Sequence, residues 1–247
     1  MNSDIRYKGH LQLAGIGPEG QRRLEKASVL VIGAGGLASA ALEYLAAAGT
    51  GRIGIVDPDI VELSNLQRQI LYTDADTGLP KAVCASRRIA SLNPSVETIV
   101  FESRFDDSTS GAILTAAPWD VALDCTDSYT SKLTVARAMA RARLPYVYGA
   151  VGRFGGQVMT VLPGHACYGC LYGDGLPGDN AEGSCAGAGI FSGVVGLTAM
   201  VQACEAMKIA GGFGSPLADR LLTIDTFTMT FTTVAIERDQ KCPVCNI

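Results

Sequence analysis

Short apolar runs alternate along the first part of the chain with longer segments of helical period. The apolar runs have the length and composition of strands buried on both faces, and glycine or a polar turn follows each run. Strands that alternate with helices predict a parallel sheet covered on both faces, with right-handed crossovers. The predicted elements are a strand, glycine turn and helix within 27–51, a strand within 51–59, a helix within 81–94, a strand at 95–101, a strand within 119–128 and a helix at 129–144.

The pattern changes from residue 145 onward. Residues 145–164 indicate strand, glycine turn and strand, and residues 220–239 alternate as a β-hairpin does. Between them, 167–185 shows no period, which is typical of a functional loop, and an apolar helix follows it. We therefore expect an α/β fold with a Rossmann-like, doubly wound, mostly parallel sheet and a C-terminal β-rich extension.

The length of 247 residues suits a single domain with a large core. Within it we expect a nucleotide-binding part at 1–144 and an extension at 145–247. A formal net charge of −4, a pI near 5.2 and the lack of a basic cluster disfavour a nucleic-acid binder.

No membrane segment is expected. Residues 183–204 carry no charge and are long enough to span a bilayer, but glycine, serine, threonine and glutamine interrupt them. A buried helix explains this segment better. Asp4, Arg6 and Lys8 interrupt any apolar export signal, so we expect a cytoplasmic protein.

A glycine-rich turn, Gly33-Ala34-Gly35-Gly36, joins the first predicted strand to its helix. Glycines let the backbone approach a phosphate, and the helix N-terminus offers free N–H groups and the positive end of its dipole. Asp57 follows about 20 residues on, where a ribose-binding acid belongs. A dinucleotide-dependent dehydrogenase is therefore the first hypothesis, beside a structural turn that binds no ligand.

The stretch DPDIVELSNLQRQ, which begins at that aspartate, changes the interpretation. A hydride-transfer enzyme needs no cations at this crevice, whereas Asn65, Arg68 and Lys81 suit the oxygens of a triphosphate. The DCTDS segment at the end of the fourth strand adds two acids, Asp124 and Asp127, as candidate ligands for magnesium. The residues thus favour Mg-ATP over a nicotinamide cofactor.

Several motifs stand in the order found in the MoeB/ThiF/HesA family, bacterial relatives of ubiquitin-activating enzymes. The motifs are GAGGLA, DPDIVELSNLQRQ, GLPKA, LNP, DCTDS, GRFGGQ and two CxxC pairs. The chain resembles this family over nearly its whole length, and its GRFGGQ segment and CPVC ending are most similar to the ThiF branch. The resemblance implies an adenylyltransferase, a nucleotidyltransferase that uses ATP and Mg²⁺. Its substrate would be the C-terminal glycine of a ubiquitin-like sulfur-carrier protein ending in Gly-Gly, as in thiamine and molybdopterin biosynthesis.

The resemblance also implies roles for the matching positions. Asp57 would bind the ribose, and Asp127 would bind magnesium. The implied phosphate ligands are Asn65, Arg68 and Lys81, the residues lining the nucleotide are Gly33, Gly35 and Gly36, the supporting residues are Asp59 and Gln69, and the catalytic residues are Arg68, Lys81, Asp127 and Cys185. A homodimer is implied as well. Since no rhodanese-like domain is recognised, any sulfur would come from a separate donor protein.

The N-terminal motif departs from the family pattern. The family opens with RYxRH or RYxRQ, whereas this chain has Arg6-Tyr7-Lys8-Gly9-His10. In relatives the second arginine reaches the ATP phosphates of the partner subunit, and Gly9 stands in its place. Lys8 or Arg6 would have to substitute, and a lysine does not reproduce the planar fork of an arginine. A non-catalytic module that binds ATP or the carrier therefore remains an alternative.

A second alternative is a related enzyme of the same fold that adenylates a carboxylate on a modified tRNA base. The acidic pI and the missing basic patch count against it. The residues do not distinguish one sulfur carrier from another.

Two CxxC pairs, Cys167 with Cys170 and Cys242 with Cys245, stand far apart in the sequence. Each pair presents two thiolates to one tetrahedral ion, and two pairs close the site. Four sulfur ligands without an open position predict structural zinc that ties the C-terminal tail to the long loop. A redox disulfide is the alternative, and the family resemblance supports the zinc site.

Cys185 ends the long loop, just before a predicted helix. A helix N-terminus lowers the pKa of a thiol and favours the nucleophilic thiolate. In some family members the matching cysteine forms a covalent link to the carrier or to a sulfur donor, so Cys185 is a candidate nucleophile, with an inert loop cysteine as the alternative. Cys84, Cys125 and Cys204 fall in helix or strand patterns and are expected in the core.

Overall fold

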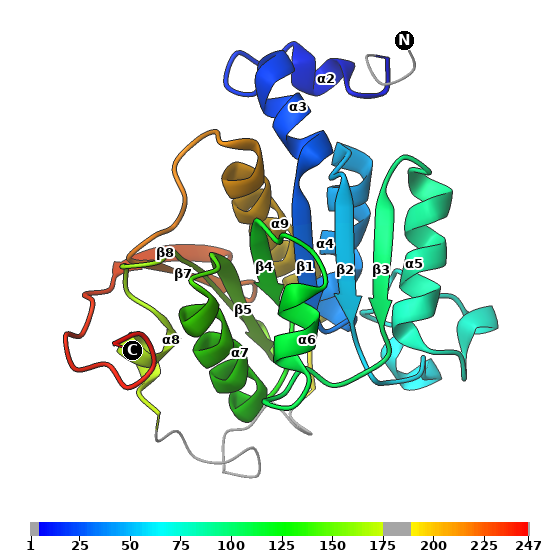
Figure 1. The fold of residues 1–247 in the computed structure, drawn as a ribbon. Coiled ribbons are helices and arrows are strands. Elements are labelled where there is room, and N and C mark those ends of the chain that lie inside the picture. Colours follow the sequence, from blue (N-terminus) through cyan, green and yellow to red (C-terminus); the bar gives the residue numbers. More distant parts are fainter. Residues whose placement is uncertain (1–4, 175–188, 247) are drawn as a thin grey trace.

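One sheet runs through the protein, seen here in a computed structural model that describes residues 5–174 and 189–246. The sheet has eight strands in the order β3-β2-β1-β4-β5-β6-β7-β8 (Figure 1). The strands are β1 (Ser28–Ile32), β2 (Arg52–Val56), β3 (Glu97–Phe101), β4 (Val121–Asp124), β5 (Tyr146–Gly152), β6 (Gly155–Val161), β7 (Arg220–Asp225) and β8 (Thr230–Ala235).

The half of the sheet from β3 to β5 is parallel, and its inner strands β1, β2 and β4 are almost entirely buried. Apolar side chains cover both sides of β1, β2 and β4, which explains why their sequences are continuous apolar runs without alternation. The predicted doubly wound, mostly parallel sheet is confirmed. The strand order reverses between β1 and β4, and ligands bind at the carboxyl ends of strands at such a switch point.

The C-terminal strands continue the same sheet in antiparallel fashion. β5 pairs with β6, β6 with β7 and β7 with β8, each in antiparallel register. β8 forms one edge of the sheet and is exposed along its whole length. The expected β-rich extension is therefore a continuation of the parallel sheet and not a separate layer.

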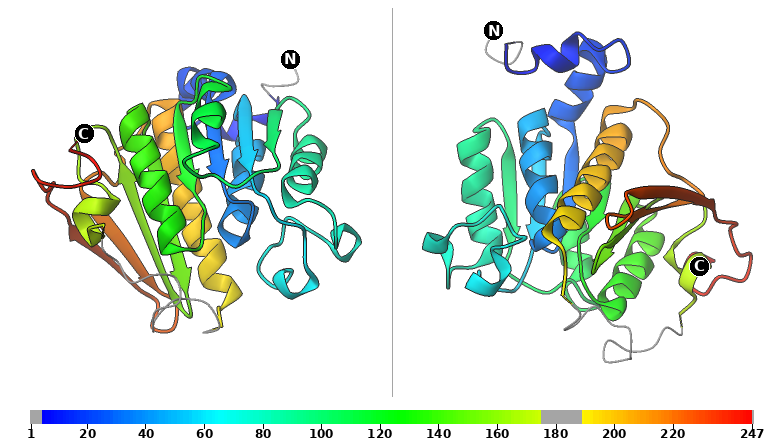
Figure 2. Two further views of the ribbon diagram at one scale, coloured as in Figure 1. Left: turned by 60° about the horizontal axis from the view of Figure 1, so that its bottom comes forward. Right: turned by 180° about the vertical axis from the view of Figure 1, so that it is seen from behind.

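Helices cover both faces of the sheet (Figures 1 and 2). One face carries α4 (Gly36–Ala48), α5 (Lys81–Leu92) and α9 (Ser192–Gly211), and the other carries α6 (Ser110–Thr115), α7 (Tyr129–Ala142) and α8 (Tyr168–Tyr172). By length and composition α9 is apolar enough to cross a membrane. It nevertheless packs against α4, β5 and β6, and Ala199, Gln202 and Ala203 on it are fully buried. It serves as a core helix, as expected.

The sequence pattern did not predict two N-terminal helices, α2 (Lys8–Leu11) and α3 (Gly17–Lys26). They lie at the amino ends of the strands, at the top of Figure 1. The buried hydroxyl of Tyr7 accepts a hydrogen bond from Nδ2 of Asn93 at 2.9 Å, and the same nitrogen donates to the Ala46 carbonyl at 2.8 Å. These contacts fix the N-terminal segment at the end of the molecule opposite the carboxyl ends of the parallel strands.

Candidate functional site

The glycine turn between β1 and α4 brings the backbone close to neighbouring segments. Gly33 has a φ of +93°, which favours glycine, and a Cβ there would lie 2.8 Å from the carbonyl oxygen of Cys125. A Cβ at Gly36 would lie 2.8 Å from Cγ1 of Val195. Gly35 is the N-cap of α4 and offers no side-chain cap. The N–H groups at the start of α4 are therefore left for an anionic ligand.

Asp57 follows β2 and contacts the glycine turn. Its Oδ2 accepts a hydrogen bond from the Ala34 N–H at 2.6 Å, and its Oδ1 accepts one from the Asp59 N–H at 2.8 Å. Burial raises the pKa of the Asp57 carboxyl above its usual value, and the two backbone hydrogen bonds and the charge of Lys81 oppose that rise. Both oxygens are held in place, and each keeps a lone pair for a hydroxyl donor.

Lys81 begins α5 with its side chain only 9% exposed. Its Nζ lies 3.0 Å from Oδ2 of Asp59. Tyr72 links this region to the glycine turn, because its buried hydroxyl donates to the Ala34 carbonyl at 2.7 Å and lies 3.3 Å from the Lys81 carbonyl oxygen. Tyr72 could not be predicted from the sequence, because its partners are backbone atoms distant along the chain and no local motif marks it.

Arg68 belongs to a second group of polar residues, in the turn after the short helix η1 (Leu63–Asn65). The Oδ1 of Asn65 accepts hydrogen bonds from Nη2 of Arg68 at 3.0 Å and from Nε2 of Gln69 at 3.3 Å. The stem of Arg68 passes the glycine turn, with its Cγ 3.6 Å from a Cβ built at Gly36. Arg68 forms no ion pair with another described residue, so its guanidinium is available to an anion.

The two acids of the DCTDS segment have different surroundings. Asp124 ends β4, is fully buried and lies 3.5 Å from Nζ of Lys132. Asp127 is exposed and makes no hydrogen bond or ion pair within the described part of the chain. The expectation that both acids are candidate magnesium ligands is therefore wrong for Asp124, because it is fully buried and α7 supplies it with a buried lysine. Of the two, Asp127 is the acid accessible to a cation.

The structure thus gathers the nucleotide-binding residues predicted from the sequence around one turn. Hydrogen bonds join the turn to Asp57, close packing joins it to Arg68 and to the β4–α7 loop, and Tyr72 joins it to the start of α5. An acid held by backbone N–H groups, two cations and a free helix N-terminus form a site that can hold a nucleotide with its phosphates.

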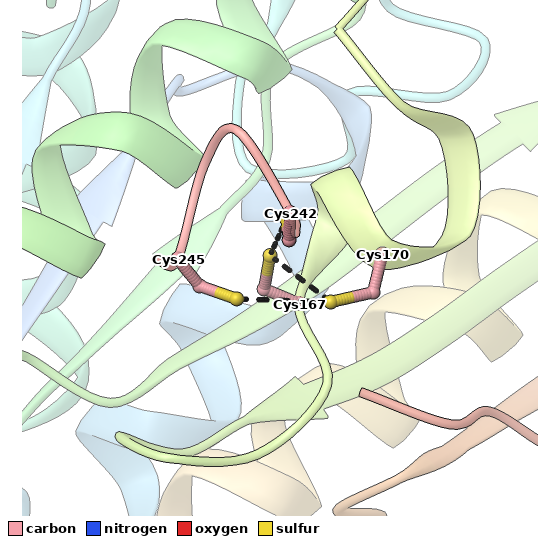
Figure 3. Close-up of side chains that lie close together, drawn as sticks. All are labelled: Cys167, Cys170, Cys242 and Cys245. Carbon is pink, nitrogen blue, oxygen red and sulfur yellow. Dashed lines mark hydrogen bonds between the residues drawn. The ribbon is translucent and has the colours of Figure 1, made fainter. Parts of the chain in front are cut away.

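Cys167, Cys170, Cys242 and Cys245 meet in space (Figure 3). Their sulfur atoms lie 3.6 Å apart between Cys167 and Cys242, 3.7 Å between Cys170 and Cys245, and 3.8 Å between Cys167 and Cys170. Four thiolates about 2.3 Å from one tetrahedral ion stand about 3.8 Å from one another, so the cluster fits zinc. A disulfide needs sulfurs about 2.05 Å apart, so the spacing does not fit the disulfide alternative.

The remaining cysteines divide into three cases. Cys84 and Cys125 are buried, as expected of core residues. Cys204 is exposed on α9, so its expected core position is wrong. The candidate nucleophile Cys185 lies outside the described residues, and its role stays a prediction.

Replacing Gly33 by alanine is expected to weaken ATP binding and to lower the melting temperature. A side chain at a positive φ costs about 1–2 kcal/mol, and this Cβ would also press on the Cys125 carbonyl. Calorimetry of ATP binding and thermal unfolding measure the two effects. Gly164→Ala is the matched control, because Gly164 has a φ of +91° but no atom within 4 Å of a Cβ. Equal ATP affinities in the two variants would contradict a phosphate-binding role for the turn.

Comparison with known proteins identifies relatives over almost the whole chain. The model of the ThiF family matches residues 7–244. A sulfur carrier protein adenylyltransferase of Thermus thermophilus is 41% identical over 246 residues, covering 97% of this chain and 90% of that protein. Two Escherichia coli proteins are each 36% identical and cover 98% of this chain. They are molybdopterin-synthase adenylyltransferase, 96% covered, and sulfur carrier protein ThiS adenylyltransferase, 94% covered.

Solved structures show the same fold. The crystal structure of Escherichia coli MccB with MccA-N7isoASN matches with a TM-score of 0.85, covering 99% of this chain and 75% of that chain. The sequence identity is 23%, so this likeness concerns the fold alone. Because the family model spans most of the chain and the relatives match at nearly full length, as the motifs indicated, this chain belongs to the ThiF family.

Proposed function

We propose that this protein is an ATP-dependent adenylyltransferase that activates the C-terminal glycine carboxylate of a ubiquitin-like sulfur-carrier protein. The observation that carries the proposal is the position of Arg68 and Lys81 beside a glycine turn to which Asp57 is hydrogen bonded. A nicotinamide enzyme has no use for these two cations, whereas a triphosphate needs them. Relatives named sulfur carrier protein adenylyltransferase and molybdopterin-synthase adenylyltransferase support the same substrate class.

In the proposed reaction, an oxygen of the carrier carboxylate attacks the α-phosphorus of ATP. A new carboxyl–phosphate bond forms, and the bond to the leaving pyrophosphate breaks. Arg68 offers its fork to phosphate oxygens, supported by Asn65. Lys81 exchanges Asp59, which is 60% exposed, for a phosphate oxygen. Such chemistry depends on positioning and charge neutralisation more than on acid–base groups.

Asp127 is the proposed magnesium ligand. Its exposed carboxylate is the hard oxygen donor that Mg²⁺ prefers, and it has no partner within the described part of the chain. When bound, Mg²⁺ neutralises phosphate charge. Asp57 remains assigned to the ribose hydroxyls, for which its two fixed oxygens are suited.

Phe154, Phe191 and Phe227 form an exposed aromatic cluster. It lies at the carboxyl ends of the strands, as the nucleotide-binding residues do. The ring centroid of Phe154 lies 5.8 Å from that of Phe191 and 5.2 Å from that of Phe227. The turns that carry Phe154 and Phe227 follow β5 and β7, which run in the direction of β1. We propose that the carrier packs on this cluster while its Gly-Gly tail passes the GRFGGQ turn into the nucleotide site.

The N-terminal segment supports a homodimer in which each subunit approaches the ATP of its partner. In its own chain, α2 lies at the amino ends of the strands, opposite the carboxyl ends where the nucleotide-binding residues are (Figure 1). Arg6 is engaged there, because its Nη1 donates to the Leu92 carbonyl at 3.0 Å. Lys8 is exposed and unpaired among the described residues, so we propose it as the cation that serves in place of the missing arginine.

Gly9→Arg is expected to accelerate adenylation. A Cβ at Gly9 meets no atom within 4 Å, so the arginine is accommodated without rearrangement. A new guanidinium on the phosphates contributes at most about 10²–10³-fold, the effect of one oxyanion donor. The initial rate of pyrophosphate release measures the change. Gly15→Arg is the control, since Gly15 is equally exposed and unobstructed and should leave the rate unchanged. An unchanged rate in Gly9→Arg would show that position 9 does not approach the phosphates.

Intact-mass analysis of a Gly-Gly carrier incubated with the protein, ATP and Mg²⁺ tests the proposed function. We expect an AMP adduct on the carrier that is absent when the terminal glycine is deleted or when Arg68 is replaced by alanine. An adduct on a modified tRNA, and on no carrier, would favour the tRNA-modifying alternative. ATP binding without any adduct would favour the non-catalytic module.

A further inference from the structure

Lys132 on α7 is a buried lysine whose hydrogen bonds are all made within this chain. Its side chain is 5% exposed. The Nζ donates to the Thr126 carbonyl at 2.8 Å and to the Gly149 carbonyl at 2.5 Å, and it lies 3.5 Å from Oδ1 of Asp124. The two carbonyls accept two of the three N–H donors of the ammonium, and the Asp124 carboxylate forms an ion pair with it. Because the side chain is buried and bound by this chain's own oxygens, Lys132 is not placed to bind a phosphate.

Stability alone does not explain this buried charge. Burying a lysine and a carboxylate removes both from water, and an apolar pair of similar volume often folds as well. Within the described residues, Oδ2 of Asp124 has no hydrogen-bond partner, so the pair is not optimised for its own stability. The two carbonyls that Lys132 binds indicate a different role, since they belong to separate segments.

One of these carbonyls lies in the β4–α7 loop, residues 125–128. Lys132 binds this loop in its middle, at Thr126, whose N–H and hydroxyl donate to Oδ1 of Asp124 at 3.0 and 2.6 Å. The loop end is capped, because Oγ of Ser128 accepts from the Ser131 N–H at 3.1 Å. The loop backbone is thus held at Thr126 and at Ser128, while the carboxylate of Asp127 between them stays exposed.

The same loop contacts the glycine turn, and a residue of α9 on the other face of the sheet hydrogen bonds to the strand end just before the loop. The carbonyl of Cys125 is the atom that a Cβ at Gly33 would meet at 2.8 Å. From α9, Nε2 of the fully buried Gln202 donates to the Asp124 carbonyl at 2.9 Å and to the Val147 carbonyl at 3.1 Å. A shift of the loop would therefore move Asp127 relative to the glycine turn.

We propose that Lys132 is a positioning residue of the nucleotide site, whose ammonium holds the β4–α7 loop so that Asp127 faces the Mg²⁺ bound with ATP. The inference rests on the proposed function, because it takes Asp127 as the magnesium ligand. The bond to Gly149 fixes the loop against β5, the strand that leads to the aromatic cluster. Lys132 acts through Asp127 and touches no substrate.

The test compares ATP binding with and without Mg²⁺ by calorimetry, together with thermal unfolding. Lys132→Met keeps the length of the side chain and removes the ammonium. In the native protein, Mg²⁺ raises the affinity for ATP. In Lys132→Met we expect this increase to be about tenfold to 10²-fold smaller, as for a misplacement of about 1 Å, while the affinity without Mg²⁺ is preserved. The control is Trp119→Phe, which removes a buried hydrogen bond to the Ile113 carbonyl, before the amino end of β4. It should lower the melting temperature and leave the Mg²⁺ effect intact.

A double variant separates positioning from stability. Asp124→Asn combined with Lys132→Met leaves no unpaired buried charge, so its melting temperature should recover relative to Lys132→Met. Its Mg²⁺ effect should not recover, because the Thr126 and Gly149 carbonyls still lack their donor. Recovery of both, or an unchanged Mg²⁺ effect in Lys132→Met, would overturn the positioning role. ATP binding requires no carrier, so a normal Mg²⁺ effect without any AMP transfer would contradict the proposed function alone.

Discussion

Lys81→Met is expected to slow carrier adenylation by about 10²–10³-fold, the loss typical of one donor to a developing anion. The substitution keeps most of the side-chain volume and removes only the charge that lies 3.0 Å from Asp59. Asp59 is 60% exposed, and the buried carboxylate of Asp57 keeps its two backbone hydrogen bonds, so no buried carboxylate is left without a partner. The melting temperature should therefore change little. The rate of pyrophosphate release at saturating carrier and thermal unfolding measure the two quantities.

The matched control for this variant is Lys26→Met. Lys26 is an exposed lysine at the end of α3, far from the nucleotide residues, and its replacement should leave the rate unchanged. If Lys81→Met adenylated carrier as fast as the native protein, Lys81 would have no role in neutralising phosphate charge.

Cys242→Ser is expected to release zinc and to melt the C-terminal tail. Structural zinc sites contribute apparent binding energies of about 10–16 kcal/mol, comparable with the whole stability of a domain at about 5–15 kcal/mol. The cluster joins the tail to α8, and Val244 packs against Gly169, where a Cβ would lie within 2.4 Å of it. Metal analysis should show loss of zinc, and thermal unfolding should show a strongly lowered melting temperature.

Cys204→Ser provides the comparison for the zinc site. Cys204 is exposed on α9 and lies outside the four-cysteine cluster, so the variant should keep its zinc and its melting temperature. Full zinc content in Cys242→Ser would contradict a site built from the four cysteines.

The parallel half of the sheet was predictable because each of its elements has a local signature. The continuous apolar run at Ser28–Ile32, followed by glycines and an alanine-rich segment, specifies strand, turn and helix without help from distant residues. The β7–β8 hairpin is marked in the same way by alternation within 220–239. The cysteine cluster was predictable because the spacing within each CxxC pair reflects the geometry of the metal.

Other features depend on residues that meet only in the fold. The burial of Asp124 follows from Lys132 on α7 and from Gln202 on α9, and no pattern around DCTDS reveals either neighbour. The role of Tyr72 rests on a bond to the Ala34 carbonyl. The core position expected for Cys204 was wrong because α9 is apolar on nearly all sides, so its sequence does not indicate which side faces solvent.

ATP–pyrophosphate exchange in the presence of Mg²⁺ tests most directly whether this chain transfers AMP to a Gly-Gly carrier. The purified protein receives sulfur carriers of the thiamine and molybdopterin types one at a time. We predict exchange with one of them, lost when the terminal glycine of that carrier is deleted and strongly reduced in Lys81→Met. Measurable ATP binding without exchange for any carrier would contradict adenylation and leave a protein that binds the nucleotide without turning it over.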